Sequence, residues 1–206
     1  MNKVEKVKKL KSGFKFYKNS FELHPPYLIL LDSNFIFAAV DSQINLEEAF
    51  TSVVKGQIYL KVSDCALKEL DQMQGRNFSE AKKYAHTKCQ KFVCKHPPKS
   101  PNQCILQALS QGFKGFVCTQ DQQLRRKIHR DYPKTPVFFI INQTLTICPP
   151  PKSLREKVKN DLIAKYAPQA IPAQVQTEKD DDFEINDDDL LLEEEEEEEE
   201  FLEDNE

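Results

Sequence analysis

The sequence lacks any apolar run long enough to cross a bilayer. No stretch of its 206 residues approaches the roughly 18–20 consecutive apolar residues of a transmembrane helix. The amino-terminal segment MNKVEKVKKLKSG has no apolar centre of the kind a signal peptide needs. The sequence also has no internal repeat. It is too short for a second full domain, since domains run to roughly 100–200 residues. We therefore expect a one-domain protein that is neither secreted nor membrane-spanning.

Acidic residues are scarce over most of the chain. Residues 1–177 hold 28 basic and 14 acidic side chains, a net charge of +14, whereas residues 178–206 hold 19 acids and one lysine. A compact body with this surplus favours a polyanionic partner, and nucleic acid is the commonest polyanion. The acidic end has too much like charge to pack, so we expect 168–206 to be a disordered acidic tail.

Short apolar runs alternate with helical patterns from residue 21 to residue 150. The runs suited to strands are 27–31, 58–63, 115–121 and 137–143, and the helical patterns are 34–40, 45–54, 65–73, 79–92, 102–112 and 122–132. This order predicts an α/β fold, a parallel sheet flanked by helices, which binds ligands at the carboxyl ends of its strands. Residues 1–20 suggest a flexible basic arm, and 151–167 suggest a basic carboxy-terminal helix.

Three acids fall at or just after expected strand ends: Asp32, Glu69 and Asp121. Carboxylates gathered at one sheet edge repel each other unless a cation lies between them. Hard oxygen ligands select magnesium or manganese, the ions that position phosphodiesters for hydrolysis. The alternative is that the aspartates only cap helices.

Four residues form a C-x4-C-x-H-x7-C pattern at 89–104, namely Cys89, Cys94, His96 and Cys104. Soft thiolates and an imidazole at such spacings match a closed, structural zinc site. The alternatives are that the four are incidental, or that His86 replaces one ligand. The other cysteines, at 65, 118 and 148, lie in or beside apolar runs and are expected to be small core residues.

The acids and the strand pattern resemble those of PIN-domain proteins. That family has an Asp closing the first strand, matched by Asp32, a Glu on a middle helix, matched by Glu69, and a T-x-D-x-D motif after a later strand. The motif here begins at Thr119 and includes Asp121, but its second acid is replaced by Gln123. A neutral side chain cannot offset the charge of a metal ion, so the substitution weakens both metal binding and activity.

With the cysteine and histidine motif inside it, the stretch from residue 8 to 155 resembles the Fcf1/Utp23 family of PIN-domain rRNA-processing proteins. The phrases LLDSNF, DCALKEL, AKKYAHTKCQ and VCTQDQQLRRKI carry the likeness. The resemblance implies a nucleolar component of the small-subunit processome that acts in early pre-18S rRNA processing. It also implies contacts with pre-rRNA, an H/ACA small nucleolar RNA and other processome proteins, and a PIN fold used for binding.

Basic side chains interleaved with aromatic residues such as Tyr84 and Phe92 suit RNA binding. The candidate RNA-binding residues are Lys8, Lys9, Lys11, Lys82, Lys83, Lys88, Lys91, Lys95, Arg125, Arg126 and Lys127. The alternative for any one of them is an ordinary solvated helix face. The sequence thus favours an RNA-binding factor with little or no nuclease activity, and the competing hypothesis is a magnesium- or manganese-dependent endoribonuclease acting on pre-rRNA.

Overall fold

The computed structural model describes residues 3–21, 23–94, 96–97 and 99–166. One six-stranded sheet has the order β3-β2-β1-β4-β5-β6. The strands are β1 (Tyr27–Leu31), β2 (Ile58–Ser63), β3 (Gln90–Phe92), β4 (Phe116–Cys118), β5 (Val137–Ile141) and β6 (Thr144–Ile147). The helices are α1 (Lys3–Phe21), α2 (Ser33–Asp41), α3 (Leu46–Val54), α4 (Asp64–Gln72), α5 (Arg76–Lys88), α6 (Pro101–Ser110), α7 (Gln122–Asp131) and α8 (Lys152–Tyr166).

The first five strands in the sheet order pair in parallel, which confirms the predicted α/β class. β6 is antiparallel to β5, and the turn between them places Asn142 and Gln143 at positive φ values of 47° and 54°. Two successive residues of positive φ suit a tight hairpin turn. The short strands β3 and β6 are too brief and too polar to stand out in the sequence, and both lie at sheet edges.

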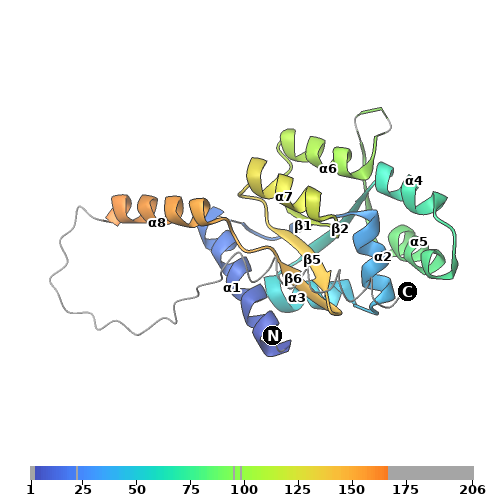
Figure 1. Ribbon diagram of the computed structural model, residues 1–206, viewed down its shortest axis with the longest axis horizontal. Coiled ribbons are helices and arrows are strands. Elements are labelled where there is room, and N and C mark those ends of the chain that lie inside the picture. Colours follow the sequence, from blue (N-terminus) through green and yellow to red (C-terminus); the bar gives the residue numbers. More distant parts are fainter. Residues whose placement is uncertain (1–2, 22, 95, 98, 167–206) are drawn as a thin grey trace, which may run out of the picture. The chain divides into compact units, whose positions relative to one another are not determined.

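Helices cover both faces of the sheet (Figure 1). Alternate residues of each strand face opposite sides: Ile29 and Leu31 join the core cluster under α1, α2 and α3, whereas Leu30 is buried outside that cluster. α6 and α7 contribute their own buried residues, including Ile105 and Ile128. Because both faces are buried, the strands consist of near-continuous apolar runs.

The expected flexible arm at 1–20 is instead helix α1. Its residues Leu10, Phe14 and Tyr17 are at most 4% exposed, and the Phe14 ring packs edge-on against Tyr27 and Phe116. The spacing of these three apolar residues places them on one helix face, a pattern that the surrounding lysines obscure. The basic segment is therefore an integral part of the domain, with lysines on its exposed side.

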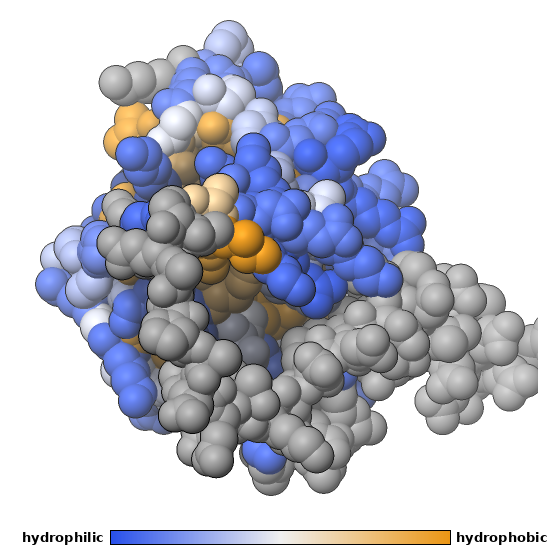
Figure 2. Space-filling model, turned by 90° about the vertical axis from the view of Figure 1, so that its left-hand side faces the viewer, coloured by the Kyte–Doolittle hydropathy of each residue, from blue (hydrophilic) through white to orange (hydrophobic). Residues whose placement is uncertain are grey.

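The carboxy-terminal helix expected at 151–167 corresponds to α8. Only its start is buried, at Leu154, whereas Leu162 and Ile163 are 51% and 55% exposed. Figure 2 shows the side of the molecule where α8 lies, with hydrophobic side chains reaching the surface among mainly hydrophilic ones. No described helix is both long and apolar enough to span a membrane. The tail expected at 168–206 lies outside the described residues.

Candidate functional site

Two of the candidate acids lie where the strand order reverses. β1 pairs with β2 on one side and with β4 on the other, so the chain winds away in opposite directions from the β1/β4 pair. Asp32 directly follows β1, and Asp121 follows β4 after Thr119 and Gln120. Ligands of open α/β sheets bind at such a switch point, outside the carboxyl ends of the strands. The topology thus brings together residues 89 positions apart in the chain.

Asp32 is 1% exposed and accepts hydrogen bonds through both carboxylate oxygens. Oδ1 accepts from the backbone N–H of Ser33 at 2.9 Å and caps α2, and Oδ2 accepts from the Thr119 hydroxyl at 2.9 Å. The pKa of Asp32 is raised to about 6, because burial and, to a smaller extent, the negative charge of Glu69 outweigh the hydrogen bonds from Thr119 and Ser33, which lower it. The capping role expected as an alternative is therefore present.

Glu69 is joined to Asp32 through one side chain. The Ser33 hydroxyl lies within hydrogen-bonding distance of both Glu69 Oε2 and Asp32 Oδ1. A serine hydroxyl has a single proton and can donate to only one of the two carboxylates at a time. Glu69 comes from α4 and is partly buried. The Ser33 hydroxyl thus links the two acids.

Asp121 has a partner that the sequence reasoning missed. Its Oδ1 accepts from the Leu124 backbone N–H at 2.9 Å and caps α7, and its Oδ2 accepts from the side-chain amide of Asn102, at the start of α6. Residues 102 and 121 come together only when α6 packs against the sheet. No spacing rule in the sequence could have found this contact.

Two neutral side chains, Asn102 and Gln123, bear on the charge of the acidic edge. Gln123, which replaces the last acid of the T-x-D-x-D motif, is exposed on α7, and Asn102 donates to Asp121. Among the described residues, the three acids do not form a group whose ligand atoms converge closely enough to share a metal ion. The acidic edge has fewer negative charges than a pair of divalent ions would require.

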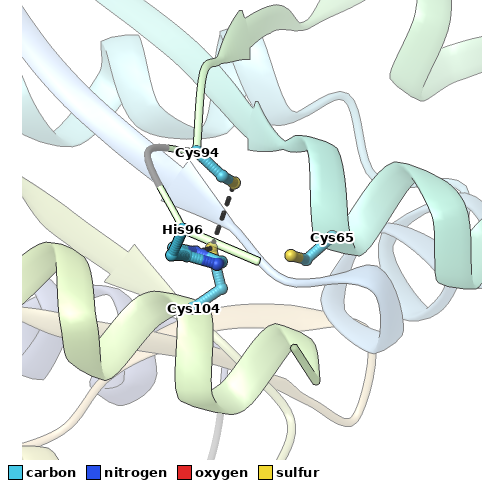
Figure 3. Close-up of side chains that lie close together, drawn as sticks. All are labelled: Cys65, Cys94, His96 and Cys104. Carbon is cyan, nitrogen blue, oxygen red and sulfur yellow. Dashed lines mark hydrogen bonds between the residues drawn. The ribbon is translucent and has the colours of Figure 1, made fainter. Parts of the chain in front are cut away.

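A second cluster consists of Cys65, Cys94, His96 and Cys104, whose ligand atoms all lie within 4.8 Å of one another. Figure 3 shows these side chains converging from α4, from the segment after β3 and from α6. The Sγ atoms of Cys94 and Cys104 are 3.3 Å apart, and His96 Nε2 is 3.2 Å from Cys104 Sγ. The cluster could hold a metal ion.

Hydrogen bonding prepares His96 for this role. Its Nδ1 lies 2.6 Å from the carbonyl oxygen of Pro97, and a carbonyl can only accept. The ring proton is therefore placed on Nδ1, and the lone pair of Nε2 faces the cysteines. Burial and the contact with Cys94 together raise the pKa of the Cys104 thiol to about 12. A metal ion would displace the thiol proton.

Cys89, the fourth ligand expected from the sequence, lies elsewhere. It precedes β3 whereas Cys94 follows it, and it packs against the core cluster, where burial and the charge of Glu47 raise its pKa to about 12. Cys65, expected to be only a core residue, occupies the fourth position of the cluster. The alternative ligand His86 instead faces Asp71, with Nε2 3.2 Å from Oδ1.

The candidate RNA-binding residues differ in exposure and in the contacts that they make. Those with exposed side chains are Lys8, Lys11, Lys83, Lys88, Lys91, Arg126 and Lys127. Lys82 and Arg125 serve the fold, because the Lys82 ammonium donates to the carbonyls of Asp71 and Met73 at the end of α4. Lys9 is half-buried on α1, and Lys95 lies outside the described residues.

We expect Arg125→Ala to destabilise the domain by about 1.5–3 kcal/mol, the range for a lost charged hydrogen bond. The Arg125 guanidinium donates to the Gln120 carbonyl at 2.9 Å and lies 4.5 Å from the centroid of the Phe139 ring. The neighbouring exposed Lys127→Ala is the control and should stay within about 0.5 kcal/mol of the parent. Urea unfolding measures both, and equal stabilities would show that Arg125 has no structural role.

The sequence and the fold are similar to those of known proteins. Residues 52–149 match the Fcf1 protein family. The human rRNA-processing protein FCF1 homolog is 26% identical over 133 residues, which cover 64% of this chain and 66% of the relative. The structure described as the PIN domain endonuclease Utp24 superposes with a TM-score of 0.55 at 26% identity, covering 60% of this chain and 92% of that one. The chain has a PIN-domain fold and is similar to the Fcf1/Utp23 rRNA-processing proteins.

This PIN domain has a further relative in the rRNA-processing protein utp23 of Schizosaccharomyces pombe. The two are 23% identical over 141 residues, which cover 65% of this chain and 52% of the relative. The chain spans less than two thirds of the length of the FCF1 homologues it matches. The matched family region includes β2 to β6 with Glu69 and Asp121, whereas β1, Asp32 and the acidic tail lie outside it.

Proposed function

We propose that this protein is an RNA-binding ribosome-biogenesis factor whose PIN domain does not cleave RNA. It would act in early pre-18S rRNA processing as a component of the small-subunit processome, in the nucleolus. The proposal draws on the relatives, which are named rRNA-processing proteins, and on the charge of +14 over residues 1–177. Pre-rRNA, an H/ACA small nucleolar RNA and processome proteins are the partners that this role requires.

The observation that carries the non-catalytic part is the contact between Asn102 and Asp121. The Asn102 amide donates to Asp121 Oδ2, so this oxygen already has a hydrogen-bond partner, and Gln123 adds no negative charge to the motif. Two-metal hydrolysis requires ions about 3.5–4 Å apart, whose mutual repulsion several carboxylates must offset. Three carboxylates carry at most three negative charges, against the four positive charges of two divalent ions, and Asp32 and Asp121 already accept two or more hydrogen bonds each.

The metal proposed for the cysteine cluster is zinc. Three thiols and one imidazole form a soft donor set, and a Zn–S distance of about 2.3 Å places tetrahedral ligands about 3.8 Å apart. The ligand separations here, all within 4.8 Å, allow one such ion to reach all four atoms. A site closed by four protein ligands has no position for a substrate, so the zinc would join α4, α6 and the segment after β3 as a structural element.

The competing function is a manganese- or magnesium-dependent endoribonuclease. The test is cleavage of a labelled single-stranded pre-rRNA fragment by the full chain in manganese, beside the Asp121→Asn variant. We expect both to bind the RNA and both to leave it intact. Cleavage by the parent alone would mean that three carboxylates suffice, and the enzyme would replace the binding factor.

A variant with added carboxylates tests separately whether the acidic edge lacks the charge needed to bind manganese. Asn102→Asp combined with Gln123→Asp adds two carboxylates beside Asp121, so manganese binding should become measurable by calorimetry in this variant alone. Its melting temperature should fall in EDTA, because of carboxylate repulsion, and recover when manganese is added. A parent that binds manganese as tightly as the double variant would contradict the role assigned to Asn102 and Gln123.

A further inference from the structure

A cleft of about 510 Å³ lies at the amino-terminal ends of the central strands, whereas the acidic residues lie at their carboxyl ends. Its volume falls within the roughly 300–1,000 Å³ of small-ligand pockets. The first residues of β1 and β4 line it, together with the end of α1 and the segments that precede β4 and β5. None of its lining residues belongs to the acidic edge or to the cysteine cluster. The proposed function therefore leaves this cleft without a role.

Aromatic rings line much of the cleft. Tyr27 and Phe116 are buried and stacked, with ring centroids 5.3 Å apart and an angle of 26° between the ring planes. Phe21 and Phe113 are only partly buried, so their rings are accessible. Phe113 is held edge-on against Phe92, with ring centroids 5.7 Å apart. An accessible ring held in place by a second ring provides a flat surface for a planar ligand.

The described polar residues at the rim favour an anion. Three of them are basic, His24, Lys114 and Lys134, and no described lining residue carries a carboxylate. The Lys134 ammonium lies 5.5 Å from the centroid of the Phe21 ring, which places a cation directly beside an aromatic wall. The cleft beside the cysteine cluster differs, because its lining includes the carboxylates of Asp64 and Asp71.

We propose that this cleft binds a nucleotide of single-stranded RNA. The base stacks on Phe113, and the phosphates on either side pair with Lys114 and Lys134. A ring and two cations match the two features shared by all nucleotides, a flat base and a negative backbone, and so accept any sequence. The inference rests on the proposed RNA-binding function and adds a second contact region, remote from the carboxyl ends of the strands.

The experiment measures binding of a fluorescein-labelled single-stranded RNA of about 12 nucleotides to the full chain by anisotropy, across a series of salt concentrations. Phe113→Ala should weaken binding about tenfold, within the range for removal of one stacked ring. Phe113→Tyr keeps the ring and should bind within about twofold of the parent. Lys134→Ala should reduce the salt slope by about 0.7, the value for one phosphate contact on a single strand.

Direct ultraviolet crosslinking to the same RNA locates the nucleotide, which we expect on a peptide containing Phe21 or Phe113. Melting curves identify any Phe113→Ala folding defect, and the exposed Lys134→Ala keeps the test decisive in that case. If the parent binds the RNA and every variant binds it equally well, the cleft is not a nucleotide site, although the proposed RNA-binding function stands. The same result is expected if the cleft binds a peptide. A parent that binds no RNA overturns the proposed function itself.

Discussion

Replacing Cys104 by serine is expected to abolish binding of the zinc proposed for the cysteine cluster and to lower the melting temperature by roughly 10 °C. Structural zinc contributes apparent binding free energies of about 10–16 kcal/mol in small zinc domains. In this larger domain, which has an extensive core besides the cluster, we expect a loss of about 3–5 kcal/mol. A domain of 150–250 residues loses about 2–4 °C for each kcal/mol. Zinc content by mass spectrometry and thermal unfolding measure the two effects.

The same experiment decides which cysteine is the fourth ligand. Cys65→Ser should reduce zinc content as Cys104→Ser does, whereas Cys89→Ser should retain one zinc per chain, because Cys89 lies against the core away from the cluster. Cys148→Ser, also buried but outside the cluster, is the matched control for the cost of placing a hydroxyl in the interior. Zinc loss from Cys89→Ser combined with zinc retention by Cys65→Ser would return the ligand set to the one read from the sequence.

This difference illustrates what sequence spacing can and cannot show. Cys94, His96 and Cys104 lie close together in the chain and form a recognisable motif, but the fourth ligand comes from another helix. Cys65 directly follows the first residue of α4, at the end of β2, and β2 pairs with β3, so the sheet brings it beside the segment that follows β3. Only the strand pairing distinguishes Cys65 from Cys89, which fits the motif better.

The fold itself was largely predictable from the sequence. Strands buried on both faces give apolar runs that the sequence displays directly, and the alternation with helices determines the parallel class. Helix α1 was missed because seven lysines in residues 1–20 dominate its composition, whereas only the spacing of its apolar residues reveals the buried face. Asn102 was missed because a single amide has no local signature and acts only across the sheet edge.

The second large effect concerns Asp32 and pH. Its pKa is about 6 in the folded protein, against an ordinary value of 3.8, so between these values the folded chain retains a proton that the unfolded chain has lost. Stability from this group is therefore present at low pH and is lost as pH rises through about 6. A shift of about two units corresponds to roughly 3 kcal/mol at neutral pH. Asp32→Asn removes this cost, and its amide oxygen can still accept from the Ser33 N–H.

We expect the stability of Asp32→Asn relative to the parent to increase by about 2 kcal/mol between pH 4.5 and pH 7.5. Urea unfolding in EDTA measures it, and because the two proteins share every other titrating group, their difference isolates Asp32. A difference that stays constant with pH would contradict the raised pKa.

Repeating the stability measurement with manganese tests whether the acidic residues bind a metal ion. An ion held between Asp32 and Glu69 would stabilise the ionised carboxylate, so manganese would stabilise the parent at pH 7.5 and leave the variant unchanged. In a binding protein, the buried charge of Asp32 remains a net cost at neutral pH with or without manganese. We expect that manganese does not stabilise the parent, since the Ser33 hydroxyl already contacts both carboxylates and the Asn102 amide donates to Asp121. Stabilisation of the parent alone would instead support the endoribonuclease.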